Sequence, residues 1–231
     1  MKVKYPHIPS LTEELQANEY NLVRILYRIN SFPRRYVAEK VDGINIQMCM
    51  EEGRVVVRSR GGRDLSRKKG EEYKWLHKFI KENYETLHRF LEVNLSRSLF
   101  WEYVPPKKPD YLTYTYREAP FIAFLDMVER GKGFIPYEES ENLVSNLFNI
   151  PRIKRIPHQP LPKLTEEYFF ELVRSIDSRK SDFGCPTIEG LVIKCYNPEN
   201  YEFFFMKIKK EDVEFIKRKF PNFSRFAISI I

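Results

Sequence analysis

Residues 40–43 read KVDG and join two segments, Tyr36–Glu39 and Ile44–Met48, whose apolar residues predict β-strands. A lysine at this corner is held by backbone on both sides, so Lys40 could be aimed at a bound phosphate as a nucleophile. The alternative is a plain β-hairpin, because an Asp-Gly pair supplies the positive φ that a type I′ turn needs. The tetrad alone does not separate these alternatives, and the rest of the sequence has to decide.

The composition is that of a basic, globular protein. The chain has 231 residues, which is enough for one large domain or two small ones with a sizeable core. A net charge of +7 and an isoelectric point near 9.2 favour a polyanionic partner such as a nucleic acid. A basic surface without any such partner is the alternative.

The cysteines and the N-terminal segment indicate the compartment. Cys49, Cys185 and Cys195 are scattered and form no CxxC or His/Cys cluster, so neither a zinc site nor a disulfide framework is expected. The start, MKVKYPHIPS, lacks the apolar core of a signal peptide, and no apolar run approaches transmembrane length. We therefore expect a soluble, cytoplasmic protein with buried free thiols.

Hydrophobic periodicity predicts a mixed α+β chain without repeats or a flexible linker, so we expect a single domain over residues 1–231. The predicted helices are Thr12–Ile29, Glu71–Leu95, Glu138–Phe148, Glu166–Ile176 and Glu211–Phe220. Besides the two strands at the corner, the predicted strands are Val55–Val57, Leu99–Val104, Phe121–Met127, Gly190–Cys195 and Tyr201–Ile208, with a hairpin turn at Glu51–Arg54.

Four further clusters carry possible chemistry. Arg58–Gly62 is a basic, glycine-containing turn, and Glu102 lies inside an apolar strand. In the third cluster, Glu189 and Lys194 place a carboxylate and an amine at the two ends of an apolar strand. In the fourth, Lys207 and Lys209 alternate along a later strand and so share one face. Each cluster also fits a structural role, as an ion pair or the solvent face of an edge strand. Five such coincidences in a fixed order are harder to explain in that way.

This order of clusters resembles the covalent nucleotidyltransferase superfamily of polynucleotide ligases and mRNA-capping enzymes. The first motif, KxDG, corresponds to Lys40, Asp42 and Gly43; the third to Phe100–Glu102; motif IIIa to Phe121–Met127; the fourth, EGxVxK, to Glu189, Gly190, Val192 and Lys194; and the fifth, KxK, to Lys207 and Lys209. The resemblance implies an α+β, ATP-grasp-like nucleotidyltransferase domain with antiparallel sheets flanked by helices.

Within the superfamily, the first motif looks most like that of the RNA ligase 2 and RNA-editing ligase group. Glu39, Lys40, Gly43 and Asn45 match the EKxxGxN form of that group, whereas DNA ligases and capping enzymes usually have Arg where Asn45 stands. The group often has His at the position of Asp42, so this residue departs from the pattern. The start Lys4–Pro9 is also similar to the N-termini of such ligases.

The resemblance implies that Lys40 attacks the α-phosphate of ATP and expels pyrophosphate. The attack requires a neutral amine, whereas a free lysine amine has a pKa of about 10.4. Nearby cations disfavour the charged amine and neutralise charge on the phosphate in the transition state. Lys207, Lys209 and a bound Mg²⁺ (or Mn²⁺) would supply these cations, so the implied catalytic residues are Lys40, Lys207 and Lys209.

The resemblance also implies roles for the remaining motif residues. Glu189 and Glu102 are the carboxylates implied for the metal region, since Mg²⁺ prefers carboxylates and water. Glu102 and Arg60 would contact the ribose, Phe124 would stack on adenine, Lys194 would hold phosphates, and Asn45 would lie near the α-phosphate or a metal-bound water. The implied ATP-binding set is Glu39, Lys40, Asp42, Asn45, Arg60, Glu102, Phe124, Lys194, Lys207 and Lys209. For Phe124, a place in the core is the alternative.

The later steps would move AMP to a 5′-phosphate of RNA and seal it to a 3′-hydroxyl. Five basic clusters are candidates for the RNA backbone: Arg34-Arg35, Arg67–Lys69, Lys107-Lys108, Arg152–Arg155 and Lys217–Lys219. About 22 residues follow Lys209, too few for the OB-fold that carries the sixth motif, so we expect an adenylation core without an OB-fold. A partner subunit, a homodimer or the segment Phe226–Ile231 could replace that fold, although we expect the segment to pack on the chain's own sheet.

Three other functions stay open at this point. A DNA ligase core, with DNA as substrate, and a GTP-using capping enzyme share the motifs, but Asn45 and the missing OB-fold argue against both. A nucleotide- or RNA-binding protein that has lost turnover is the alternative from another class. The intact set of motif lysines and carboxylates argues against it.

Overall fold

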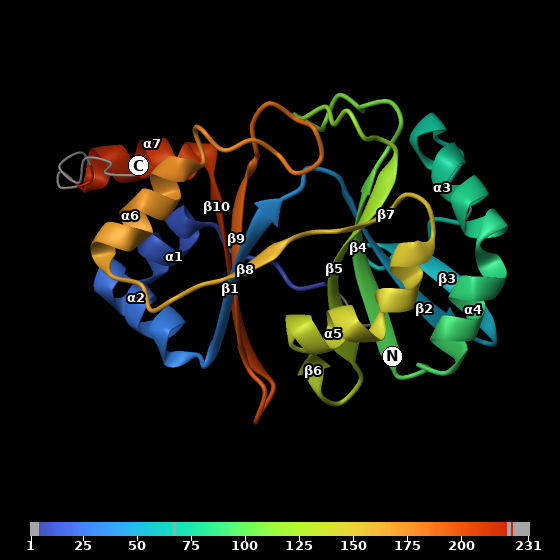
Figure 1. Ribbon diagram of the computed structural model, residues 1–231. Coiled ribbons are helices and arrows are strands. Elements are labelled where there is room, and N and C mark those ends of the chain that lie inside the picture. The colour runs from blue at the N-terminus through green and yellow to red at the C-terminus, as the bar shows by residue number, and fades with distance from the viewer. Residues whose placement is uncertain (1–4, 67, 221–222, 224–231) are drawn as a thin grey trace. The chain divides into compact units, whose positions relative to one another are not determined.

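The computed structural model describes residues 5–66, 68–220 and 223, and its chain packs as two compact units (Figure 1). The first unit consists of Asp42–Ile156 with the described part of Met1–Pro6. The second consists of His7–Val41 with the described part of Pro157–Ile231. Neither unit is one continuous stretch of chain. Lys4, Arg67 and the segment Phe226–Ile231, for which we made predictions above, lie outside the described residues.

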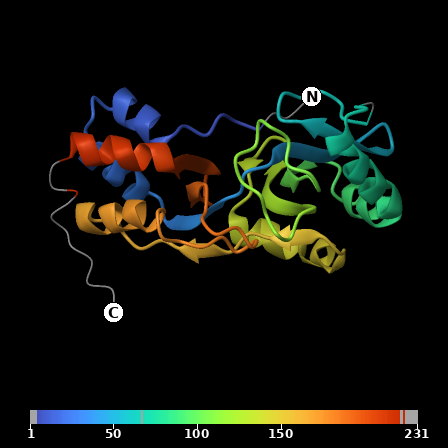
Figure 2. The same cartoon turned by 90° about the horizontal axis from the view of Figure 1, so that it is seen from above.

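The second unit is a four-stranded antiparallel sheet with helices on one face (Figures 1 and 2). The strand order is β10-β9-β1-β8, with β1 Arg34–Lys40, β8 His158–Pro160, β9 Gly190–Asn197 and β10 Glu202–Lys209. The helices are α1 Leu11–Ala17, α2 Leu22–Ser31, α6 Glu166–Ser175 and α7 Lys210–Lys219.

The core of this unit lies between the helices and one face of the sheet. Val37 of β1, Ile193 of β9 and Met206 of β10 face each other across the strands and are buried against apolar residues of the helices. Because successive side chains on a strand point to opposite faces, the residues between them are directed to the face without helices.

The first unit is a larger sheet whose strands run in the order β3-β2-β4-β5-β6, with β7 paired to β5 in parallel. Its strands are β2 Ile44–Glu51, β3 Arg54–Ser59, β4 Arg97–Val104, β5 Phe121–Glu129, β6 Gly133–Phe134 and β7 Ile153–Arg155. Its helices are α3 Glu71–Glu82, α4 Tyr84–Glu92, α5 Tyr137–Leu143 and the 3₁₀ helix η1 Ser145–Asn149. The predicted α+β class with mostly antiparallel sheets flanked by helices is confirmed.

Three predicted helices are interrupted in the structure. The helix expected at Thr12–Ile29 is divided into α1 and α2, because Glu19 and Tyr20 adopt positive φ and Asn21 caps a new helix by accepting from the Arg24 amide. The helix expected at Glu71–Leu95 is divided at Asn83. The one expected at Glu138–Phe148 continues as η1 after α5. Amphipathic spacing persists across each break, so periodicity did not reveal them.

The alternative of a plain β-hairpin at residues 40–43 is excluded. β1 pairs with β8 and β9 in one sheet, whereas β2 pairs with β3 and β4 in the other. Gly43 does not have a positive φ. A β-carbon at Gly43 would lie 2.7 Å from the carbonyl oxygen of Tyr103 and 2.9 Å from Cγ of Glu102. Glycine is required here for close approach of strands rather than for a turn. The predicted turn at Glu51–Arg54 does join paired strands, β2 and β3.

Two further expectations concern the cysteines and membrane-spanning helices. Cys49, Cys185 and Cys195 are buried free thiols, as predicted. In the described part of the chain, no helix combines the length and apolar character that crossing a membrane requires.

We predict that Gly43→Ala destabilises the protein by about 1–3 kcal/mol, because the added carbon overpacks a site bounded by backbone. The free energy of unfolding in urea measures this. Gly61→Ala is the matched control, since its β-carbon would come no closer than 4.0 Å to the side chain of Ser59. Equal stability of Gly43→Ala and the wild type would contradict the close approach.

Candidate functional site

The four motif lysines of the second unit lie on one face of its sheet. Lys40 on β1 and Lys209 on β10 are both paired with Gly190 of the strand between them. Lys207 is paired with Val192, and Lys194 lies two residues further along β9. Paired residues and residues two apart share a face. Lys40, Lys194, Lys207 and Lys209 are therefore directed to the face without helices.

Gly190 makes room in this row. A β-carbon at Gly190 would lie 2.1 Å from the carbonyl oxygen of Ile208 and 3.1 Å from Cα of Lys209. No residue with a β-carbon fits at that distance. The row Lys40, Gly190, Lys209 therefore carries an amine at each end and no side chain between them.

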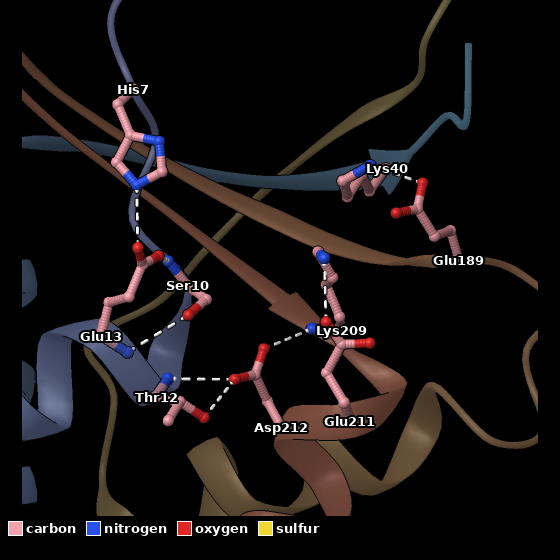
Figure 3. A network of polar contacts seen from close by, with 9 residues as sticks. All are labelled: His7, Ser10, Thr12, Glu13, Lys40, Glu189, Lys209, Glu211 and Asp212. Carbon is pink, nitrogen blue, oxygen red and sulfur yellow. Dashed lines mark hydrogen bonds and ion pairs between the residues drawn. The ribbon is translucent and has the colours of Figure 1, made fainter. Parts of the chain in front are cut away.

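Each of these two amines is paired with a carboxylate (Figure 3). Nζ of Lys40 donates to Oε2 of Glu189 at 2.5 Å, and both side chains are mostly buried. Nζ of Lys209 donates to Oε1 of Glu211 at 2.9 Å. This hydrogen bond to Glu211 is the main reason that the pKa of Lys209 is raised. Glu189, which the resemblance implied for the metal region, thus contacts Lys40 directly.

Glu39 is on the opposite face from Lys40. Its carboxylate is buried and accepts hydrogen bonds from Oγ of Ser181 at 2.6 Å and from the amide of Asp182 at 2.9 Å. Burial is the main reason that the pKa of Glu39 is raised. These contacts fix the segment after α6 to β1 and give no support to an ATP contact through this side chain, which stays a prediction.

In the first unit, Asp42 holds the connection between β4 and β5. Its Oδ2 accepts from the amides of Thr113 at 2.6 Å and Tyr114 at 2.9 Å. Its own amide donates to the hydroxyl of Tyr116 at 2.8 Å. This carboxylate is thus engaged with backbone donors. Its predicted part in binding ATP stays a prediction.

Asn45, Arg60 and Glu102 come together in the same unit. Asn45 of β2 is paired with Glu102 of β4, so both side chains share a face. The amide of Arg60 donates to the carbonyl oxygen of Asn45 at 3.2 Å. Oδ1 of Asn45 is buried and has no hydrogen-bond partner among the described residues. A buried acceptor without a donor is uncommon, and it fits a bound group that donates hydrogen bonds.

Phe124 lies on the other face of that sheet. It is paired with Trp101, the neighbour of Glu102 in β4, and the two rings meet edge to face with centroids 5.1 Å apart. Its side chain is fully buried, with Phe148 also in contact. The register therefore gives no support to stacking on a base bound beside Glu102. The stacking role stays a prediction.

The described residues contain no group of three or more His, Cys, Asp or Glu side chains able to hold a metal ion alone. Glu189 and Glu102 belong to different units. In the second unit, the carboxylate of Glu189 is an oxygen donor of the kind that suits Mg²⁺ or Mn²⁺, which take most of their ligands from water and substrate phosphates.

Several members of the predicted RNA-binding clusters are bound within the chain. Lys154 pairs with Glu118, Arg155 with Glu141, and Lys217 with Glu214. Lys108 donates to the carbonyl oxygen of Leu112. The clusters stay candidates, and none stands out by its contacts.

One buried carboxylate of the second unit was missed by the sequence analysis. Asp212 is almost fully buried and accepts from the amide of Lys209 (Figure 3). It occupies the third position of α7, where an acidic residue reaches back to the residue that starts the helix. That position was a readable signal, but its long-range partner in α1 was not.

Comparisons with known proteins identify the family and the fold. The profile of the RNA ligase family matches residues 34–211. An archaeal ATP-dependent RNA ligase superposes with a TM-score of 0.59 at 19% identity, covering 91% of this chain and 49% of that one. A mutant of the RNA ligase from Naegleria gruberi, solved with ATP and Mn, gives 0.61 at 15% identity, covering 94% and 58%.

A protein assigned as an ATP-dependent DNA ligase from Aquifex aeolicus also superposes, with a TM-score of 0.59 at 18% identity, covering 96% of this chain and 56% of that one. The chain thus spans about half the length of the solved structures that it matches. Comparison with curated proteins found no match. At these identities the structures show the fold, and the family profile, which covers most of the sequence, shows that this chain belongs to the RNA ligase family.

Proposed function

We propose that this chain is the adenylation part of an ATP-dependent RNA ligase and that Lys40 forms a covalent bond to AMP. The observation that carries the proposal is the row in which Lys40 and Lys209 flank Gly190, with Lys194 and Lys207 on the same face. Four cations on one sheet face suit a triphosphate. Membership of the RNA ligase family supports the same activity.

In the proposed first step, Nζ of Lys40 attacks the α-phosphorus of ATP. A nitrogen–phosphorus bond forms, the bond from phosphorus to the β-phosphate oxygen breaks, and pyrophosphate leaves with that electron pair. The charged amine has to lose one proton before the attack, to free its lone pair, and the nitrogen loses a second one to pyrophosphate or water after its bond to phosphorus has formed. Glu189 is the proposed acceptor of the first proton, because its carboxylate is 2.5 Å from Nζ of Lys40.

Lys207, Lys209 and Lys194 would bind the phosphates and offset the charge that develops during the attack. A bound Mg²⁺ or Mn²⁺ would neutralise phosphate charge and orient pyrophosphate as the leaving group. Glu189 is the proposed contact to the ion or its water molecules. For Asn45, a place near the α-phosphate or a metal-bound water rests on the resemblance, and its buried Oδ1 without a partner among the described residues supports a bound group. The Naegleria gruberi ligase, solved with ATP and Mn, supports this choice of nucleotide and metal.

We further propose that the two units act as one nucleotidyltransferase domain, since motif residues are divided between them. The shared face of Asn45 and Glu102 supports a nucleotide contact in the first unit. Arg60 as a ribose contact and Glu102 as a second metal contact rest on the resemblance alone, as do Glu39, Asp42 and Phe124 as ATP contacts.

For the later steps, we propose transfer of AMP to the 5′-phosphate of RNA and sealing to a 3′-hydroxyl. The family and the basic charge of the chain support an RNA substrate. Help from a partner subunit or a homodimer stays a proposal, since the chain spans about half the length of its structural neighbours.

We predict that the wild-type protein, incubated with α-labelled ATP and Mg²⁺ and then denatured, retains covalent label, whereas Lys40→Ala retains none. Lys78→Ala is the matched control, because Lys78 is an exposed lysine on α3, and it should label like the wild type. Label from GTP instead of ATP would favour the capping-enzyme alternative. Absence of label with either nucleotide, at any pH or with either metal, would contradict the proposed function.

The second prediction concerns Glu189. Glu189→Gln keeps the shape but cannot take a proton, so the rate of label formation should fall by about 100-fold or more. Single-turnover labelling across a Mg²⁺ titration measures this rate. Glu214→Gln is the control, since Glu214 forms a comparable but exposed pair with Lys217. A Glu189→Gln variant as fast as the control would show that Glu189 is not needed.

The third prediction concerns the acceptor. Labelled protein, freed of ATP, should pass its AMP to 5′-phosphorylated RNA and to little 5′-phosphorylated DNA of the same sequence. Gel analysis of the nucleic acid measures the transfer, with 5′-hydroxyl RNA as the control that cannot accept. Transfer to DNA alone would contradict the RNA assignment and favour the DNA ligase alternative.

A further inference from the structure

Asp212 connects the fifth motif to the start of the first helix. Its Oδ2 accepts from the amide of Lys209 at 2.8 Å, and its Oδ1 accepts from the amide and the hydroxyl of Thr12 at 3.0 and 2.5 Å (Figure 3). The carboxylate is 1% exposed. A charge buried this deeply is stable only when hydrogen bonds surround it, and here three donors do so.

The residues Pro9 and Ser10, just before α1, contact Lys207, the other lysine of the fifth motif. The amide of Lys207 donates to the carbonyl oxygen of Pro9 at 2.9 Å, and Ser10 forms a parallel bridge with Lys207. Ser10 is itself fixed by a capping box with Glu13. The segment Pro9–Thr12 is therefore ordered by its own contacts when it meets β10.

β10 needs this support because it lies at the edge of its sheet. Its only strand neighbour in the described chain is β9, so the outer side of its backbone has no strand partner. Pro9 takes the outer amide of Lys207, and Asp212 takes that of Lys209. Both lysine backbones are thereby fixed at the end of β10, where their side chains share the face with Lys40.

We propose that Asp212 and Thr12 are positioning residues for adenylation, which act by fixing the backbone of Lys207 and Lys209 and so the direction of both amines. This inference rests on the proposed function, in which those amines bind phosphates. Thr12 and Asp212 lie outside residues 34–211, the part of the chain that the RNA ligase profile matches. Neither residue of the Asp212–Thr12 contact therefore belongs to the matched stretch.

Positioning should affect the rate more than the binding of ATP. Cations that act on the developing charge are effective only when they are held in place, and a shift of about 1 Å can cost about 100-fold in rate. Thr12→Val removes the hydroxyl donor but keeps the shape and the amide, so its effect should be moderate. Thr12→Ser keeps the hydroxyl donor, so its rate of adenylation should be close to that of the wild type.

The test is single-turnover labelling of the full chain with α-labelled ATP and Mg²⁺. Thr12→Val and Asp212→Asn should lower the maximal rate by about 10-fold or more, with less than about a two-fold change in the ATP concentration for half-maximal rate. Thr12→Ser should stay within about two-fold of the wild type. Amide hydrogen exchange at Lys209 should be faster in Asp212→Asn.

Ile29→Val, a substitution in the core of α2, is the control for stability. Wild-type rates in Thr12→Val and Asp212→Asn would overturn the inference. So would a loss no larger than that of Ile29→Val, or failure of Thr12→Ser to restore the rate. If Asp212→Asn does not fold, Thr12→Val and Thr12→Ser decide. Absence of label in the wild type would overturn the proposed function, and this inference with it, whereas a labelled wild type with unaffected variants would overturn the inference alone.

Discussion

The close approach of β9 and β10 at Gly190 is the constraint on which the candidate site depends. The carbonyl oxygen of Ile208 occupies the space that a β-carbon would need. This contact sets the register that pairs Gly190 with Lys209 on one side and Lys40 on the other. A shift of one residue would turn every side chain of β10 to the opposite face. The lysines would then enter the core, and Ile208 would leave it.

One face of this sheet packs against the helices and the other carries the motif lysines, and the alternation of side chains along each strand supplies both. Val37, Ile193 and Met206 bury apolar surface against the helices. The residues that alternate with them lie outside this core, on the face that carries Lys40, Lys207 and Lys209. Since the core fixes the register, the hydrophobic effect positions the lysines without any direct contact between them. Asp212 and Thr12 extend that control to the edge strand, where strand pairing alone leaves one side of the backbone without a strand partner.

Lys40 is paired with Glu189 in this structure. An ion pair of this kind stabilises a charged amine that is mostly buried, because an isolated charge at such a site would be costly. Entry of a triphosphate would give the lysines a stronger anionic partner and Glu189 a metal ion or a proton. The ion pair in the structure and the proposed reaction therefore both use Lys40 and Glu189, but in different ways.

The sequence predicted the features that are local. Alternation in residues 207–209 predicted two amines on one face. Glu189 correctly marked the start of a strand, but that strand runs over Gly190–Asn197, so Lys194 lies inside it and not at its end. The sequence did not predict what long-range contacts decide. The break at Glu19 and Tyr20, the placement of β1 and β2 in separate sheets, and the partner of Asp212 some two hundred residues away all depend on tertiary packing. Phe124 shows the limit for the site, since only the register with Trp101 reveals its face.

Lys40, one of four lysines on a shared face, is the proposed nucleophile. Mass spectrometric peptide mapping of the protein after incubation with ATP and Mg²⁺ tests it most directly, because the map assigns the modified residue among all four. The account predicts a single adenylyl group on the peptide that contains Lys40. An adenylyl group on Lys194, Lys207 or Lys209 instead, or an unmodified map, would contradict it.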